Sequence, residues 1–518
     1  MKAYKFLLLL IGLSITGCSD LEEEPVGLLA PEGFFQTPKD IQTAVDGALT
    51  HAINEKFWGR KLSIALMLRS DMVDLASDET RRVEMNELTT LGNNGMISEF
   101  WPKTYQGIAA ANQAIAGAEL VGATDELKNP IIAQAYFVRA FYYFHLVRQF
   151  GAIPYIDAPI TDADAAATIS KTLAAEVYAN IIADLEFAKT WLPDTQASRA
   201  MPSKAAASSY LALVYLTMAG TDDKANFKKA FDEAQEVINK RGDYKLALDA
   251  DYQTLFDATK IDGSLEPIFA LDYNNFEAPD NAYDQIAPMT GIRGDDRNSG
   301  GGWSVAVPAL AVYDTWDAGD YRRAVSMDDA TKFDDDNDET TPSVEYPYTQ
   351  FGIAPGSLHK FAKQRPYIAK YTRFPGPFAR ANARATSHNY SMIRYAEVLL
   401  IAAEAAVELD DNASAIKYLN EVRTRARLGG SWKSTGPSAT PADHTGTVTV
   451  ADVMEERRLE FAFEGKRWYD IARRKMGAAP YNVFSASGLE GDKPGFSADD
   501  YLMPIPADEI ERNPNLGN

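Results

Sequence analysis

The sequence predicts a mostly α-helical protein, in which a scaffold of paired helices resembling tetratricopeptide (TPR) repeats carries a large loop-rich lobe. Two observations predict this class. Apolar residues recur with helical spacing over most of residues 39–241 and again over residues 391–428. Between them, residues 242–390 are rich in proline and glycine and show no regular apolar spacing. The 518 residues, 46% of them hydrophobic, are enough to bury a large core without disulfides.

The N-terminus has the features of a signal peptide over residues 1–17. Lys2 and Lys5 precede a short apolar run that is too short to span a bilayer. The run ends in Ile-Thr-Gly-Cys, which resembles a bacterial lipobox, so we expect Cys18 to be lipidated. It is the only cysteine. The alternative is an ordinary secretory signal that happens to be followed by cysteine.

Residues 18–38 are expected to form the lipidated N-terminus and an acidic tether. The tether sequence Ser-Asp-Leu-Glu-Glu-Glu covers residues 19–24. An acidic tract is repelled by an anionic membrane and should stay extended. It also resembles the acidic signal that sends lipoproteins of Bacteroidetes to the outer cell surface, although a plain charged linker would have the same composition.

The first part of the scaffold, residues 39–241, is predicted from six periodic segments. They cover residues 41–53, 101–118, 131–149, 173–192, 203–218 and 226–240. Gly151 and Pro154 end the third, and Pro193 ends the fourth. Small residues within these segments would let paired helices approach closely and bury a shared face.

The rest of the chain divides into three predicted parts. The lobe of residues 242–390 should carry the functional loops, because long irregular stretches in compact proteins are usually functional. Two more helices are expected in the second part of the scaffold, residues 391–428, with Gly429 and Gly430 after them. Residues 429–518 should be irregular apart from one helix that contains the charged run described next.

A dense charged run stands near the C-terminus. Residues 456–471 read ERRLEFAFEGKRWYDI. We interpret it structurally, as a network of opposite charges that holds a helix end. The expected members are Arg457, Arg458 and Arg467 with Glu456, Glu460, Glu464 and Asp470.

This run and three other motifs resemble the SusD/RagB family, the outer-membrane nutrient-binding lipoproteins of Bacteroidetes. The other motifs are IRYAEVLLIAAEA at residues 393–405, LNEVR at 419–423 and YLMPIP at 501–506. The resemblance implies about four TPR-like helix pairs beside an irregular lobe. It also implies no cofactor, a position on the outer face of the outer membrane, and a SusC-like TonB-dependent β-barrel transporter as the partner that receives captured oligosaccharide.

The net charge and the absence of catalytic motifs argue against several classes of function. The formal net charge is −22, and it becomes two units more negative once Lys2 and Lys5 are removed. Such a surface argues against nucleic acid and favours a neutral glycan over a polyanion. The sequence contains no HExxH zinc motif, no GxSxG nucleophile motif and no glycine-rich phosphate loop. We therefore expect a binding protein rather than an enzyme. The alternatives are a hydrolase of the same glycan and a binder of another nutrient such as peptide.

One acidic cluster could bind calcium. Asp334, Asp336, Asp338 and Glu345 have the spacing of some ligands in an EF-hand loop. However, Glu339 stands where that loop needs glycine, so a solvated acidic loop is the favoured interpretation.

Exposed aromatic rings are the best candidates for sugar contacts, because their faces stack on the apolar faces of sugar rings. Trp303 follows three glycines in the lobe, and Trp58 lies in a loop after the first predicted helix. Trp101, Trp191, Trp316 and Trp468 fall in helical patterns and should belong to the core. The predicted ligand site contains Trp303, Trp58, Tyr283, Tyr273, Arg293, Asp296 and Asn298. A β-glucan, an α-glucan or a fructan would each fit such a site.

Overall fold

The computed structural model describes residues 31–273, 284–292, 302–333, 344–353, 363–376, 385–433, 436–478, 483–486, 493 and 496–517. The signal peptide, Cys18 and the acidic tract lie outside these residues. So do Tyr283, Arg293, Asp296, Asn298, Asp334, Asp336 and Asp338.

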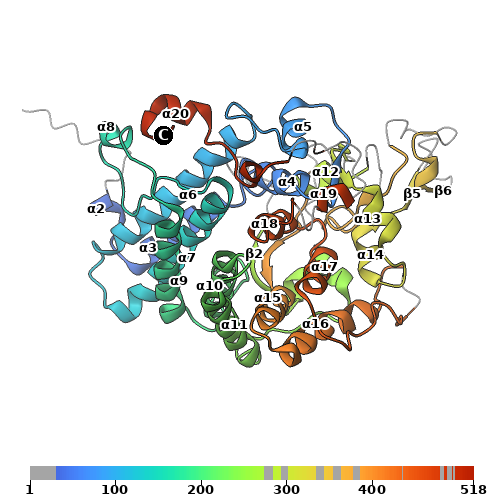
Figure 1. Ribbon diagram of the computed structural model, residues 1–518. Coiled ribbons are helices and arrows are strands. Elements are labelled where there is room, and N and C mark those ends of the chain that lie inside the picture. Colours follow the sequence, from blue (N-terminus) through green and yellow to red (C-terminus); the bar gives the residue numbers. More distant parts are fainter. Residues whose placement is uncertain are drawn as a thin grey trace, which may run out of the picture.

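Within the described residues, eight long helices form four pairs, as a TPR-like scaffold requires (Figure 1). Each helix contacts its partner, and each pair also contacts the next one along the row. The pairs are α3 (Pro38–Thr50) with α6 (Ile97–Ala118), α7 (Asp125–Phe150) with α9 (Ala174–Trp191), α10 (Lys204–Ala219) with α11 (Lys224–Asn239), and α15 (Tyr395–Glu408) with α16 (Asn412–Arg427). The fold class predicted from the sequence is confirmed.

Close approach between the helices depends on small residues. A Cβ atom on Gly107 of α6 would lie 2.4 Å from the ring of Tyr142 on α7. The Tyr142 hydroxyl in turn donates a 2.7 Å hydrogen bond to the Ala48 carbonyl of α3. Three helices from two pairs therefore meet at this point. Burial of the hydroxyl is tolerated because its hydrogen bond is satisfied.

The lobe packs beside the scaffold and is built from short elements (Figure 1). The described strands form four two-stranded antiparallel sheets, which pair β1 with β3, β2 with β8, β4 with β7 and β5 with β6. The strands are β1 (Val73–Leu75), β2 (Pro267–Leu271), β3 (Ala306–Pro308), β4 (Met327–Asp328), β5 (Ala330–Phe333), β6 (Val344–Pro347), β7 (Tyr367–Ile368) and β8 (Tyr390–Arg394).

Shorter helices connect these parts. They are α2 (Pro31–Phe34), α4 (Lys61–Leu68), α5 (Thr80–Glu87), α8 (Ala163–Ala166), α12 (Ile286–Thr290), α13 (Leu310–Thr315), α14 (Tyr321–Ser326), α17 (Val450–Glu460), α18 (Arg467–Arg473), α19 (Val483–Ala486) and α20 (Ala507–Arg512). Single 3-10 turns are η1 (Tyr252–Phe256), η2 (Ile261–Gly263), η3 (Tyr348–Gln350), η4 (Ala498–Tyr501) and η5 (Pro514–Leu516). Among all described residues, no helix is both long enough and apolar enough to span a bilayer.

Two predictions about individual elements need correction. The periodic segment that begins at Met392 is a strand, β8, until Arg394, and the helix starts only at Tyr395. Residues 390–394 pair with β2, and this long-range pairing overrides their helical spacing. The charged run forms two helices, α17 and α18, separated by a turn in which Phe463 and Gly465 have positive φ angles.

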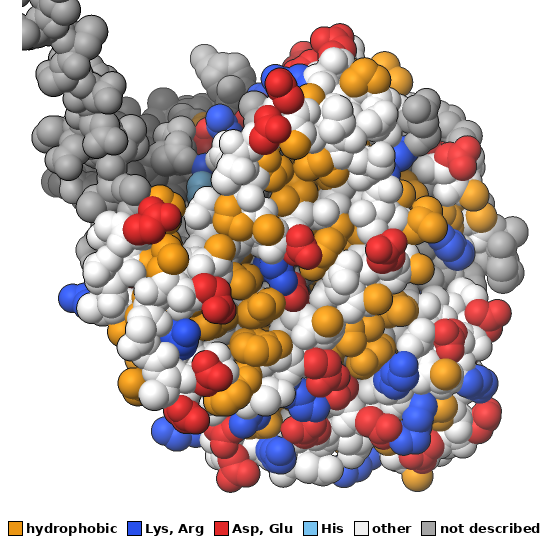
Figure 2. Space-filling view, turned by 90° about the vertical axis from the view of Figure 1, so that its left-hand side faces the viewer, with side chains coloured by type: hydrophobic (Ala, Val, Ile, Leu, Met, Phe, Trp, Pro, Cys, Tyr) orange, Lys and Arg blue, Asp and Glu red, His pale blue; other side chains and the backbone are white. Residues whose placement is uncertain are grey.

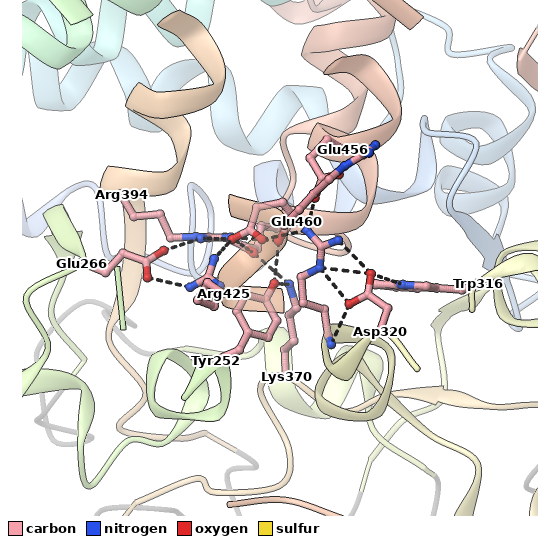
Figure 3. A network of polar contacts seen from close by, with 12 residues as sticks. Tyr252, Glu266, Trp316, Asp320, Lys370, Arg394, Arg425, Glu456 and Glu460 are labelled. Atoms are coloured by element: carbon pink, nitrogen blue, oxygen red, sulfur yellow. Dashed lines mark hydrogen bonds and ion pairs between the residues drawn. The ribbon is translucent and has the colours of Figure 1, made fainter. Parts of the chain in front are cut away.

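The charged run does form a buried network, as predicted, but mostly with distant partners (Figure 3). Glu460 accepts hydrogen bonds from Arg322 of the lobe at 3.0 Å and from Arg394 at the end of β8 at 2.5 Å. It also pairs with Arg425 of α16. Burial alone would raise the pKa of Glu460, but these guanidinium groups hold it well below its usual value.

Pairs within the run itself are fewer. Arg457 donates to Asp470 at 2.9 Å, while Arg467 binds Asp71 beyond the end of α4 at 2.7 Å. Arg458 pairs with Glu455 at a more exposed position. The network therefore joins the lobe, the second half of the scaffold and the C-terminal helices into one body, and it does not resemble an open binding site.

Candidate functional site around Trp303

Trp303 lies where two backbone segments of the lobe touch. The amide of Gly302 donates to the Ile292 carbonyl at 2.9 Å, and that of Val305 donates to Met289 at 3.0 Å. A Cβ atom on Gly302 would lie only 1.9 Å from the Gly291 carbonyl oxygen. Glycine is therefore required at position 302 for close backbone contact, rather than for the freedom to extend the indole.

The Trp303 side chain is half-buried and packs one side against the main hydrophobic core. Its backbone amide donates to the Pro288 carbonyl at 2.5 Å, which holds it against α12. The indole is thus fixed in place, with part of its surface accessible. A fixed ring loses little conformational entropy when a ligand binds, which suits a stacking platform.

Strand β1 brings polar groups from far away in the sequence to the same edge. Leu75 faces Ala306 in the β1–β3 ladder, and the Ala76 amide donates to Val305 at 2.8 Å. The ladder ends there, since Ser304 has a positive φ angle, and the exposed Asp78 follows in the segment before α5. Arg82 follows on α5, paired with Glu79 at 2.8 Å and next to the Met289 sulfur. Sequence reasoning missed Arg82 because nothing local links it to Met289, whose carbonyl accepts from Val305.

Asp284 joins the start of α12 to Thr386 through hydrogen bonds. It is buried, accepts a 2.6 Å hydrogen bond from the Thr386 hydroxyl, and accepts another at 2.7 Å from the Ile286 amide at the start of α12. Burial raises the pKa of Asp284 to about 7. Among the described residues no cation pairs with this carboxyl, and burial favours its protonated form.

Two predicted site residues are buried and cannot stack on a ligand. Trp58 is 2% exposed, with His145 and Tyr390 against its indole at ring distances of 5.4 and 5.1 Å. Tyr273 is 3% exposed. The structure therefore corrects both assignments. The loop after the first helix turns inward at Phe57 and Trp58, because both pack into the core under α4.

The other tryptophans are mostly structural. Trp316 is 3% exposed and its indole nitrogen donates to Asp320 at 3.0 Å, so its predicted place in the core is confirmed. Trp101 and Trp468 are also buried, whereas Trp191 is half-buried. Trp432 is half-buried too, but the Arg373 guanidinium covers its ring at 4.1 Å. Of the two predicted platforms, Trp58 is buried and Trp303 is half-buried.

In the described part of the chain, no group of three or more His, Cys, Asp or Glu side chains is arranged to hold a metal ion. His145 and His388 are buried, and burial lowers the pKa of both, that of His388 to about 4. Neither histidine is presented at the Trp303 face.

Comparison with known proteins places this chain in a family. A model of the SusD family matches residues 343–518, and a model described as starch-binding and associating with the outer membrane matches residues 38–216. A SusD-like protein of Formosa agariphila is 49% identical over 527 residues, which cover 100% of this chain and 99% of the relative. The chain belongs to the SusD family.

Solved SusD-type structures share the architecture at low identity. A SusD homolog from Bacteroides thetaiotaomicron superposes with a TM-score of 0.77 at 21% identity, covering 94% of this chain and 97% of the other. Surface glycan-binding protein A of the same species, solved with laminarihexaose, gives a TM-score of 0.71 at 21% identity over 92% of this chain and 98% of the other. These two likenesses show the fold.

Proposed function

We propose that this SusD-family protein is a cell-surface lipoprotein that captures a neutral oligosaccharide or polysaccharide and delivers it to a SusC-like TonB-dependent β-barrel transporter. The observation that carries the proposal is the 49% identity to a SusD-like protein over the whole chain. The match to a starch-binding, outer-membrane-associated family model agrees with it. Solved relatives of the same fold include a laminarin-binding SusD-like protein.

The Trp303 face supports binding rather than catalysis. A half-buried indole on a rigid backbone can stack on a sugar ring, and Arg82, beside Met289 of the neighbouring α12, is a polar group that could approach the ring's hydroxyl groups. Cleavage of a glycosidic bond would need two carboxyl groups on opposite sides of that bond. The net charge of −22 favours a neutral polymer over an anionic one.

The experiment is a calorimetric titration of the wild type and Trp303→Ala with a β-glucan, an α-glucan and a fructan. We expect the wild type to bind at least one of them. Loss of the stacking platform should weaken that binding by about tenfold to a hundredfold, because truncation of a central anchor typically costs roughly 1–3 kcal/mol.

Two control variants separate a site effect from a folding effect. Trp303→Phe keeps a smaller aromatic face and should retain more affinity than Trp303→Ala. Trp316→Ala removes a buried indole and should lower the melting temperature, at a cost of roughly 3–5 kcal/mol in the free energy of unfolding. If Trp303→Ala bound glycan normally, or if it failed to fold, the assignment of Trp303 as a stacking platform would be wrong.

A further inference from the structure

A mostly apolar groove of about 640 Å³ lies on the scaffold, well away from Trp303 in the sequence and the fold. It runs between α6, the segment that carries α8, and the C-terminal α20 and η5. On the side of the molecule that carries α2, α3 and α8, apolar side chains gather in patches between charged ones (Figure 2). The lining includes Tyr105, Ala109, Pro154, Ile160, Ala166 and Leu516.

The floor of the groove is one stripe of α6. Pro102, Gln106, Ala109 and Gln113 all line it and follow one another at helical spacing. The same stripe continues to Gly117, where it is already covered. A Cβ atom on Gly117 would lie 2.3 Å from the ring of Phe35. The chain thus enters the described fold, just after α2, at one end of the groove.

The other end of the groove is closed by the C-terminal segment. The Ala507 amide at the start of α20 donates to Gly92, which shortly precedes α6, at 2.8 Å. The Asn513 side chain donates to the Ile169 carbonyl at 2.7 Å. Arg512, which also lines the groove, has a side chain that is 69% exposed. It forms an ion pair at 2.7 Å with Glu509, which lines the groove as well.

We propose that residues 25–30 occupy this groove and hold the start of the chain against α6. Their sequence, Pro-Val-Gly-Leu-Leu-Ala, is apolar and directly precedes α2. Six extended residues span about 20 Å. The stripe from Gln113 to Pro102 rises about 17 Å along the helix axis, so length and position agree. Burial of Val26, Leu28 and Leu29 would cover apolar groove surface.

The charges at this end of the groove are balanced. Arg512 is already paired with Glu509, so charge does not decide the direction of residues 25–30, which rests on where the chain enters α2 and on length.

This inference extends the proposed function, and it rests on that proposal for one point, the lipidation of Cys18. With residues 25–30 held, the free tether between Cys18 and Pro25 reaches at most about 25 Å. The lipid would then leave the protein beside α20, so that this end of the scaffold faces the membrane and the orientation of the Trp303 face above it is fixed.

The test is chemical cross-linking between pairs of introduced cysteines. Cys18→Ser in the full chain removes the only thiol. Leu28→Cys together with Ala109→Cys should then be joined by a short bis-maleimide within the same molecule. The matched control is Leu28→Cys with Asp46→Cys. Asp46 is an exposed position on α3. It lies eight residues from the start of that helix at Pro38, and Ala109 lies eight residues from Gly117, where Phe35 covers α6. Little cross-linking to Asp46→Cys is expected. Equal cross-linking of both pairs, or none to Ala109→Cys, would overturn the proposal.

A second measurement does not depend on the cross-linker. The thiol of Leu28→Cys should react with a maleimide at least tenfold more slowly than that of Glu22→Cys. Ala109→Trp, which fills the groove from α6, should bring the Leu28→Cys rate up to that of Glu22→Cys. Equal rates without Ala109→Trp would mean that the groove is open to a partner protein and that the proposal is wrong. Because these readouts involve no polysaccharide, they can succeed even if glycan binding fails, and the reverse also holds.

Discussion

At the scale of single residues, Asp284 is the carboxyl whose ionisation should matter most to the lobe. Burial raises its pKa to about 7, while the same group in an unfolded chain titrates near 3.8. Between these values the folded protein holds a proton that the unfolded chain has released. This contribution to the free energy of unfolding therefore decreases as the pH rises from about 4 to about 7, and it stays low above that.

Asp284→Asn should remove this pH dependence, because the amide resembles the protonated carboxyl. We expect the variant to be more stable than the wild type by roughly 1–3 kcal/mol at pH 8 and to differ little at pH 5. Denaturant unfolding of both proteins at the two pH values measures this difference in the free energy of unfolding. Asp243→Asn, at an exposed position, is the control and should have no such effect. A variant equally destabilised at both pH values would show that the carboxylate is required.

Individual residues also show where sequence reasoning failed. Trp58 and Trp303 both precede or follow glycine in predicted loops, yet one is buried and the other half-buried. The difference comes from the packing of Trp58 against His145 and Tyr390, which lie far away in the sequence. Burial of a loop side chain depends on such long-range contacts, and local patterns do not contain them.

At the scale of elements, the helices were predictable because their signals are local. The segment before Pro193 is α9, and the segment after Ser203 is α10, whose N-cap is the Ser203 hydroxyl. The strands were not predictable in the same way. Pairing of β2 with β8 joins residues 267–271 to residues 390–394, and neither segment shows a strong alternating pattern on its own. Arg82, which lies beside Met289, was missed for the same reason.

Substitutions in the buried ion pairs between α17 and its partners should lower the free energy of unfolding strongly. Glu460→Gln leaves Arg322, Arg394 and Arg425 buried with one negative charge fewer. Removal of one partner from a buried ion pair typically costs roughly 3–5 kcal/mol. We expect a loss of that order in the free energy of unfolding, measured by denaturant titration.

The matched control for this prediction is Glu455→Gln on the same helix. Glu455 pairs with Arg458 and its side chain is 50% exposed, so the expected cost is below about 1 kcal/mol. Equal effects of the two substitutions would contradict a structural role for the buried network.

At the scale of the whole molecule, the proposed location depends on Cys18. Cys18→Ala should abolish lipidation, and the protein should then leave the outer-membrane fraction, because two or more acyl chains are what hold a soluble domain on a bilayer. Fractionation of cells and a mild-detergent pull-down measure this. The wild type should recover a β-barrel transporter and Cys18→Ala much less of it. Unchanged membrane retention of the Ala variant would refute the lipid anchor.

The central claim is that the whole protein binds a neutral glycan without cleaving it. The most direct measurement is native affinity electrophoresis through gels that contain a β-glucan, an α-glucan, a fructan or an anionic polysaccharide, with reducing ends assayed on the same polymers. The account predicts retardation in at least one neutral gel, no retardation in the anionic gel, and no reducing ends above those of a mock purification. Release of reducing ends, or free migration in every neutral gel, would contradict it.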